Sequence, residues 1–297
     1  MKAKRRFDIW LWVLLCVPCL LASCDHDVHD GEEEGGLSVS LTWADEADQG
    51  TDVKDVKLWI FNADDGSLVE EKHYGSAQEV ASQRFQLPEG TYRILTTTNL
   101  TEPFFISEQT RALTNWNNIQ IGLTNPKDVN HNAYFGVADV KIANKEGSYV
   151  VQNPIRSVLA ELTIIIENIP KGTEMSGKAL DAAWCLFPTQ KNGDGDYGLP
   201  SIEPAEVELP TLLATESTLK SEVIRLMPTI QGSPASHIYL RLQLPDKTLQ
   251  EFDITAPKMN VGGKYELRFK YEEMQPKMNL QTGINDWNDL NKEVTIK

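Results

Sequence analysis

Leu37-Ser-Val-Ser-Leu-Thr-Trp43 alternates apolar and polar side chains along its whole length. Because successive side chains of a β-strand point to opposite faces of the sheet, this period of two predicts a strand with one buried face. Similar stretches, alternating or rich in β-branched residues, recur along the chain with turn-forming residues between them. We therefore expect further strands at residues 53–61, 87–98, 133–142, 156–167, 236–244, 263–271 and 293–297.

These expected strands fall into two series. Short strands separated by turn signals are typical of a β-sandwich, and a second such series begins near Asn153. A chain of 297 residues is long enough for two domains of ordinary size. We expect an all-β protein with one β-sandwich domain at residues 37–152 and another at residues 153–297. Residues 216–227 fit a helix or a strand equally well.

The composition is that of an ordinary globular protein, with 41% hydrophobic and 24% charged residues. The formal net charge is −15. A surface this acidic repels phosphate backbones, and no basic patch interrupts it in the body of the chain. The composition therefore argues against a nucleic-acid partner.

The N-terminus has the features of a secretory signal at residues 1–23. A basic start is followed by an apolar run at residues 9–21, which is shorter than the ~20 residues that a membrane-spanning helix needs. The run ends in Leu21-Ala-Ser-Cys24, which resembles a bacterial lipobox. We expect cleavage before Cys24 and acylation of this cysteine by two palmitate-like chains, which together anchor a protein stably. The alternative is an ordinary signal peptide with a chance cysteine.

Residues 24–36 are acidic, rich in glycine and almost free of apolar side chains, so we expect a solvated tether. An acidic stretch directly after a lipidated cysteine also resembles the export signal of surface-exposed lipoproteins in the Bacteroidales. Cleavage removes Cys16 and Cys19, and acylation would leave Cys185 as the single free thiol. Its apolar, strand-like surroundings favour a buried inert thiol over a nucleophile.

Catalytic and metal-binding motifs are weak or absent. The sequence contains no Gly-x-Ser-x-Gly, no His-Glu-x-x-His and no phosphate-binding glycine-rich loop, so we expect neither an enzyme nor a cofactor. His26 and His29 in the tether make a poor metal site because a flexible segment loses much entropy on ordering. The one irregular calcium candidate has Tyr197 where a calcium loop requires glycine, and a plain hairpin loop is the default. Its expected ligands are Asn192, Asp194, Asp196 and Glu203.

Three stretches resemble the fimbrillin-type proteins of the type V fimbriae of Bacteroidales. Leu87-Pro-Glu-Gly-Thr-Tyr-Arg-Ile-Leu-Thr-Thr-Thr-Asn99 is similar to a strand of their first domain, and Asn153-Pro-Ile-Arg-Ser-Val-Leu-Ala-Glu-Leu-Thr-Ile164 resembles the strand that opens the second. Val261-Gly-Gly-Lys-Tyr-Glu-Leu267, followed by Ile284-Asn-Asp-Trp287, resembles the closing pair. The resemblance implies two tandem Greek-key, transthyretin-like sandwiches. It also implies a role as a stalk, tip or membrane-anchor subunit.

The arginines favour the anchor among these roles. In the resembling family, stalk and tip precursors are thought to lose an N-terminal segment by cleavage after arginine, whereas the anchor keeps its lipid. The first arginine after Cys24 is Arg84, and cleavage there would remove several expected strands. The resemblance therefore implies a lipid-retaining anchor of the outer membrane. It would bind pilin subunits by strand complementation, in which a partner strand pairs with an exposed sheet edge.

A second class of function stays open, namely a surface lipoprotein that binds glycans or host ligands through exposed aromatic side chains. The expected positions of the tryptophans make this the weaker alternative. Trp43, Trp59 and Trp287 lie in strand patterns and are expected in the core, whereas Trp116 lies in a loop-like stretch. A single exposed tryptophan is a poor glycan platform.

Overall fold

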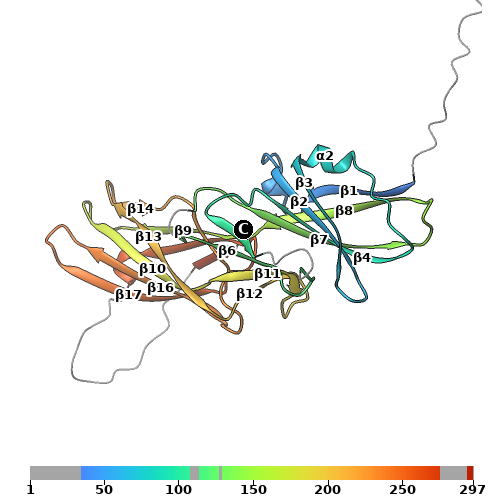
Figure 1. Cartoon of the computed structure of the whole chain (residues 1–297). Coiled ribbons are helices and arrows are strands. Elements are labelled where there is room, and N and C mark those ends of the chain that lie inside the picture. The colour runs from blue at the N-terminus through green and yellow to red at the C-terminus, as the bar shows by residue number, and fades with distance from the viewer. Residues whose placement is uncertain (1–34, 108–113, 127–128, 275–292, 297) are drawn as a thin grey trace, which may run out of the picture.

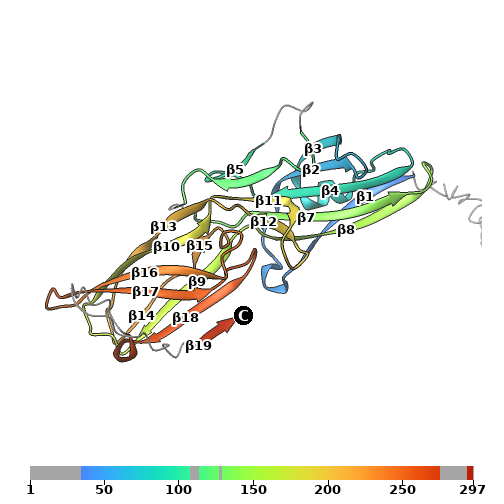
Figure 2. The same ribbon diagram turned by 90° about the horizontal axis from the view of Figure 1, so that it is seen from below.

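The computed structural model describes residues 35–107, 114–126, 129–274 and 293–296, and these form two β-rich halves that lie end to end (Figures 1 and 2). The first half contains a six-stranded sheet in the order β1-β8-β7-β4-β2-β3, in which β1 and β8 are parallel. Its strands are β1 (Gly36–Trp43), β2 (Lys54–Asn62), β3 (Leu68–Ser76), β4 (Gly90–Thr98), β7 (Tyr134–Ile142) and β8 (Ser148–Ser157).

Both faces of this six-stranded sheet are covered. On one face, Leu37, Val39 and Leu58 pack beneath the short helix α2 (Ala77–Ala81), which contributes Val80. The opposite face carries Trp59 and other large side chains toward a second, four-stranded sheet with the order β12-β11-β6-β5. Its strands are β5 (Phe104–Ser107), β6 (Gln120–Leu123), β11 (Cys185–Lys191) and β12 (Tyr197–Pro200).

The second half is a sandwich of two sheets around its own apolar core. One sheet has the order β13-β10-β16-β17, and the other has the order β14-β9-β18-β19 with β15 also paired to β9. The strands are β9 (Ala160–Glu167), β10 (Glu174–Ala183), β13 (Pro204–Leu213), β14 (Thr218–Lys220), β15 (Ile224–Leu226), β16 (Ala235–Gln243), β17 (Leu249–Pro257), β18 (Lys264–Lys270) and β19 (Glu293–Ile296).

The predicted all-β class is confirmed, and the strands expected from the alternating pattern are present. The single long strand expected at residues 156–167 is wrong, because the chain turns between β8 and β9. Ser157 Oγ accepts a hydrogen bond from the Leu159 amide and donates one to the Leu159 carbonyl, at 3.1 Å each. Residues 216–227, which fitted either a helix or a strand, form β14 and β15 with the irregular segment between them.

The predicted domain boundary at 152/153 falls inside β8, whose end still pairs with β7 of the first sheet. The four-stranded sheet of the first half combines β5 and β6 with β11 and β12, which come from the other side of that boundary. The chain therefore crosses between the halves near residues 158–159, 184 and 201–203. The division into two folding units and the Greek-key connectivity stay predictions.

A glycine in β7 allows a polar contact across the six-stranded sheet. Asn153 on β8 reaches over Gly136 on β7 and donates from Nδ2 to Thr96 Oγ1 on β4, at 2.9 Å. A Cβ atom at position 136 would lie 2.5 Å from Asn153 Oδ1 and 2.8 Å from the Pro154 carbonyl oxygen. No real Cβ atom tolerates contacts this short, and the second neighbour is backbone.

We predict that Gly136→Ala destabilises the folded protein by about 1–3 kcal/mol, the usual effect of overpacking a core. Gly193→Ala is the matched control, because its Cβ would meet no atom within 4 Å. Urea denaturation of the lipid-free protein measures both variants. Equal midpoints for the two would show that β7 and β8 move apart without resistance.

Candidate functional site: the junction and the sheet edges

A small apolar core fills the junction between the halves. Val158 and Leu159 are fully buried there with Phe135 and Ala133 from the first half. Met227, together with the partly buried Val261, completes this core from the second half. Backbone hydrogen bonds cross the same region, from the Val158 amide to the Ala133 carbonyl at 2.8 Å.

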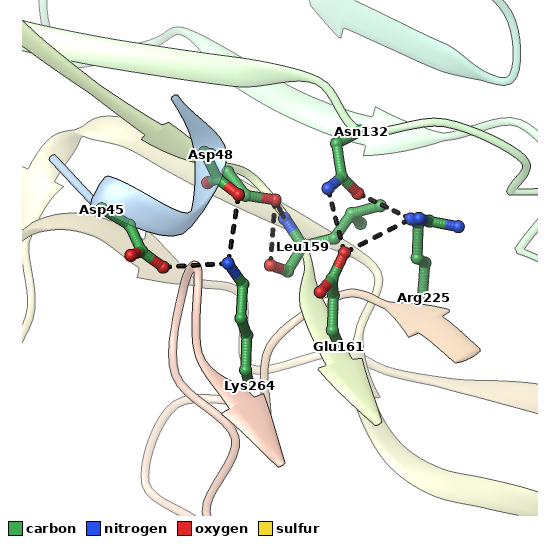
Figure 3. Close-up of polar contacts among 8 residues, drawn as sticks. Asp45, Asp48, Asn132, Leu159, Glu161, Arg225 and Lys264 are labelled. Atoms are coloured by element: carbon green, nitrogen blue, oxygen red, sulfur yellow. Dashed lines mark hydrogen bonds and ion pairs between the residues drawn. The ribbon is translucent and has the colours of Figure 1, made fainter. Parts of the chain in front are cut away.

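Two acidic residues after β1 bind a lysine of the second half (Figure 3). Lys264 Nζ, at the start of β18, lies 3.0 Å from Asp45 Oδ2 and 3.1 Å from Asp48 Oδ1. Asp48 belongs to the short 3₁₀ helix η2 (Glu46–Asp48) and is itself buried. Burial alone would lower the pKa of Lys264, but its hydrogen bonds to the two carboxylates outweigh burial and raise the pKa above its usual value. The lysine is therefore charged at physiological pH.

A second polar group closes the junction beside the first (Figure 3). Asn132, just before β7, donates from Nδ2 to Glu161 Oε1 at 3.1 Å and accepts from Arg225 Nε at 2.9 Å. Arg225 on β15 and Glu161 on β9 are register partners whose side chains also form an ion pair, at 3.5 Å. Asn132 thus attaches the first half to an ion pair of the second.

Sequence reasoning missed both groups. The partners of Lys264 lie more than two hundred positions earlier in the chain, and no local motif links them. Isolated Asp, Asn and Lys residues are usually solvated, so only the topology shows which of them meet.

We predict that Lys264→Met lowers the free energy of unfolding by about 2 kcal/mol, because Asp48 loses its charged donor while buried. The matched control is Lys171→Met, an exposed lysine in the turn before β10, which should change stability by less than about 0.5 kcal/mol. Thermal or urea unfolding measures both. Equal effects would mean that the Asp45, Asp48 and Lys264 contacts contribute only as a surface ion pair.

Three of the four predicted calcium ligands lie in the hairpin loop between β11 and β12. Asn192 Oδ1 accepts from the amides of Asp194 and Asp196, at 2.9 and 3.0 Å, so the loop is closed by its own backbone. Glu203 lies beyond β12, where its carbonyl accepts from the Trp184 amide. In the described part of the chain, no three His, Cys, Asp or Glu side chains gather in a way that could hold a metal ion. The calcium site stays a prediction, and His26 and His29 lie outside the described residues, as does Cys24.

The remaining histidines are engaged in structural contacts. His73 contacts Asp55, His237 contacts Asp181, and His131 lies beside Asn130 and the Phe104 ring. The His73 and His237 contacts each join two neighbouring strands of one sheet. His131 Nε2 also lies 3.2 Å from Thr101 Oγ1, but that nitrogen is shared with the Asn99 carbonyl, at 3.3 Å. The described residues therefore give no positive indication of catalysis.

Cys185 is buried, as expected. Burial raises the pKa of its thiol, with Glu203 adding to the effect and Ser201 opposing it. A thiol that stays protonated at neutral pH is a poor nucleophile.

The expectation of an exposed Trp116 is wrong. Trp116 is only 4% exposed, because the loop that carries it folds back onto the six-stranded sheet. Its ring packs edge-on against Phe61, and the Arg93 guanidinium lies 5.4 Å from the ring centre. Among the described tryptophans, the largely exposed one is Trp184, at the junction, with 43% of its surface accessible, whereas Trp43 is partly buried. Trp59 is buried as expected, and Trp287 lies outside the described residues.

The edge strands differ in how well they resist pairing with another chain. β5, β12 and β14 are short, and β3 carries a run of charged side chains. β13 is long but has two register shifts against β10, and it contains Pro204 and Pro210. Short length, charge, bulges and proline are the usual protections of an edge. β17 differs from these strands, since it pairs with β16 over nine residues without a register shift and its one proline, Pro257, is its last residue.

An open groove of about 580 Å³ lies beside β13, between the two sheets of the second half. Val207, Leu209 and Ile224 contribute apolar side chains, whereas Lys220 and Glu222 contribute charges of both signs. The lining is therefore mixed, with apolar side chains beside charges of both signs.

The sequence matches a known protein family. A family model described as fimbrillin-A associated anchor proteins Mfa1 and Mfa2 matches residues 24–291. The chain belongs to this family. The resemblance seen in the three sequence stretches is thereby confirmed, and the family indicates a fimbrium-associated protein of the cell surface. No curated protein sequence matches the chain significantly.

Solved structures share the fold at low sequence identity. The fimbrial anchor protein Mfa2 from Porphyromonas gingivalis aligns with a TM-score of 0.54 at 13% identity, covering 79% of this chain and 90% of that protein. A candidate cell adhesion protein from Bacteroides eggerthii gives a TM-score of 0.55 at 12% identity, with 89% and 96% covered. A candidate polysaccharide-binding protein from Bacteroides thetaiotaomicron gives 0.55 at 9% identity, with 82% and 94% covered. At these identities the comparison establishes the fold alone.

Proposed function

We propose that this protein is a non-enzymatic fimbrial anchor, held in the outer membrane and facing outward through diacylated Cys24, which binds pilin subunits by strand complementation. Membership of the anchor family supports the fimbrial role. In the described residues, no helix is long and apolar enough to span a bilayer. The proposal assigns membrane attachment to the lipid.

The observation that carries the anchor role is the integration of β1 into the fold. Leu37 and Val39 are completely buried, and β1 pairs with β8 along its whole length. Arg84 is exposed after α2, so a cut there would sever β1, β2 and β3 from the rest of the six-stranded sheet. Such a cut would destroy the first half rather than release a pro-segment. A chain that keeps β1 also keeps the tether in front of it.

The strand-pairing surface is assigned to the outer edge of β17. This strand ends its sheet and is regular over nine residues, without the register shifts of β13. Its one proline, Pro257, is its last residue, whereas β13 carries Pro210 in its interior. An extended segment can continue such a sheet through main-chain hydrogen bonds, with alternate side chains resting on the sandwich.

The alternative is a ligand-binding surface lipoprotein on the same scaffold. Its support is weaker, because Trp116 is buried and Trp184 is the one largely exposed tryptophan of the described residues. Glycan platforms generally need more aromatic surface than one side chain supplies.

Replacement of the lipidated cysteine tests the anchor. In the native organism, Cys24→Ala should release the protein from the membrane and shed fibres into the medium, because nothing then holds the fimbrial base. Cys185→Ala is the matched control, since it removes a buried thiol and leaves the tether intact. Detergent extraction with mass spectrometry should recover pilin subunits with the wild type. Recovery of the protein alone, with fibres unaffected by Cys24→Ala, would favour the ligand-binding alternative.

Site-specific photo-crosslinking tests the assigned edge. Leu249 on β17 and Leu213 on β13 are matched, since both are exposed leucines on edge strands of one sheet. A photoreactive residue at position 249 should crosslink to a pilin subunit, and one at position 213 should not. The reverse result would place the partner at the groove beside β13 and leave the anchor role standing.

A further inference from the structure

β1 is both the first strand of the fold and the strand nearest to the proposed tether. It starts at the end of the molecule farthest from the second half and runs toward the junction, as both views show (Figures 1 and 2). Asp45 and Asp48, just after β1, contact Lys264 of the second half, which confirms that β1 ends at the junction.

β8 lies beside β1 and points in the same direction. The two strands are in register from the Gly36–Ser148 pair to the Trp43–Ile155 pair. β8 then passes through Val158 and Leu159 into β9 of the second half. A pull between the tether and the second half therefore enters at the start of β1. Of the three crossings between the halves, the one at the end of β8 continues the strand that is hydrogen-bonded to β1 along its whole length.

We infer that the β1–β8 ladder is a shear clamp that resists axial tension on the anchored fimbrium, an inference that rests on the proposed attachment at Cys24. The two strands are drawn in opposite directions along their own axis. In a parallel ladder the hydrogen bonds are evenly spaced, so a pull along the axis loads them together. A pull across the ladder would load them one at a time from the end.

The end of β1 where tension enters is also bonded on its second side. Leu37 exchanges two backbone hydrogen bonds with Phe85, both at 2.9 Å. On the same side, Ser38 Oγ donates to the Ala81 carbonyl at 3.1 Å. On the β8 side, the Gly36 amide extends the ladder by donating to the Gly147 carbonyl at 2.8 Å. Sliding of β1 must break these bonds together with the ladder.

Side-chain burial adds resistance to the same movement. Leu37 and Val39 have no accessible surface and lie under Val80 of α2. Pulling β1 out exposes both side chains to water, which is unfavourable because both are apolar. The main resistance is kinetic, because forced unfolding depends on the height of the unfolding barrier.

Single-molecule force spectroscopy on the full lipid-free chain tests the clamp. One handle is attached at position 24 and the other at position 247, in the β16–β17 turn at the distal end of the second half. The control geometry moves the second handle to position 145, in the exposed turn before β8. That placement loads the same ladder across its axis, from the end where Gly36 faces Ser148.

A disulfide variant identifies which rupture in the force traces is the separation of β1 from β8. Ser40→Cys with Gln152→Cys links register partners of the two strands, and its oxidation should abolish the rupture that belongs to β1. We expect this rupture at a several-fold higher force with handles at 24 and 247 than at 24 and 145. Equal or lower force in the axial geometry would overturn the clamp. The measurement uses no lipid or pilin, so a result that overturns the clamp would leave the proposed anchor role untouched.

Discussion

The burial of Val158 and Leu159 is the constraint on which the rest of the structure depends. Both residues lie where the chain leaves β8 and enters β9, so they belong to neither sheet and still have no accessible surface. Side chains from both halves surround them, and the polar contacts of Lys264 and Asn132 close the rim of this core. Because apolar burial is non-directional, the polar contacts add a directional constraint to this packing.

The strands of this fold could be predicted because one face of each is buried and the other is polar. The pattern at residues 37–43 shows this alternation directly, and β1 matches it. The turn at Ser157 was missed because the apolar run continues through it. Val158 and Leu159 are as buried as the strand residues around them, so hydropathy carries no signal of the change of sheet.

The site residues were predictable only where a local signal exists. Cys185 lies in an apolar stretch, and its burial followed from that stretch. Trp116 lies among asparagines, which correctly indicated a loop, but loop composition says nothing of where a loop packs. The contacts of Lys264 join segments from the two ends of the chain. A single sequence contains no local pattern that predicts such a long-range contact.

The interleaving of the halves has a consequence for biogenesis. When a chain emerges N-terminus first, the strands from β1 through β8 emerge before β11 and β12. The four-stranded sheet of the first half requires both of these later strands. The first half thus stays open on one face until residue 200 is released, and its large apolar side chains remain exposed during that interval. Such a late, non-local closure slows folding and favours association with other chains. A chain that emerges from its N-terminus can therefore complete the first half only after part of the second half has emerged.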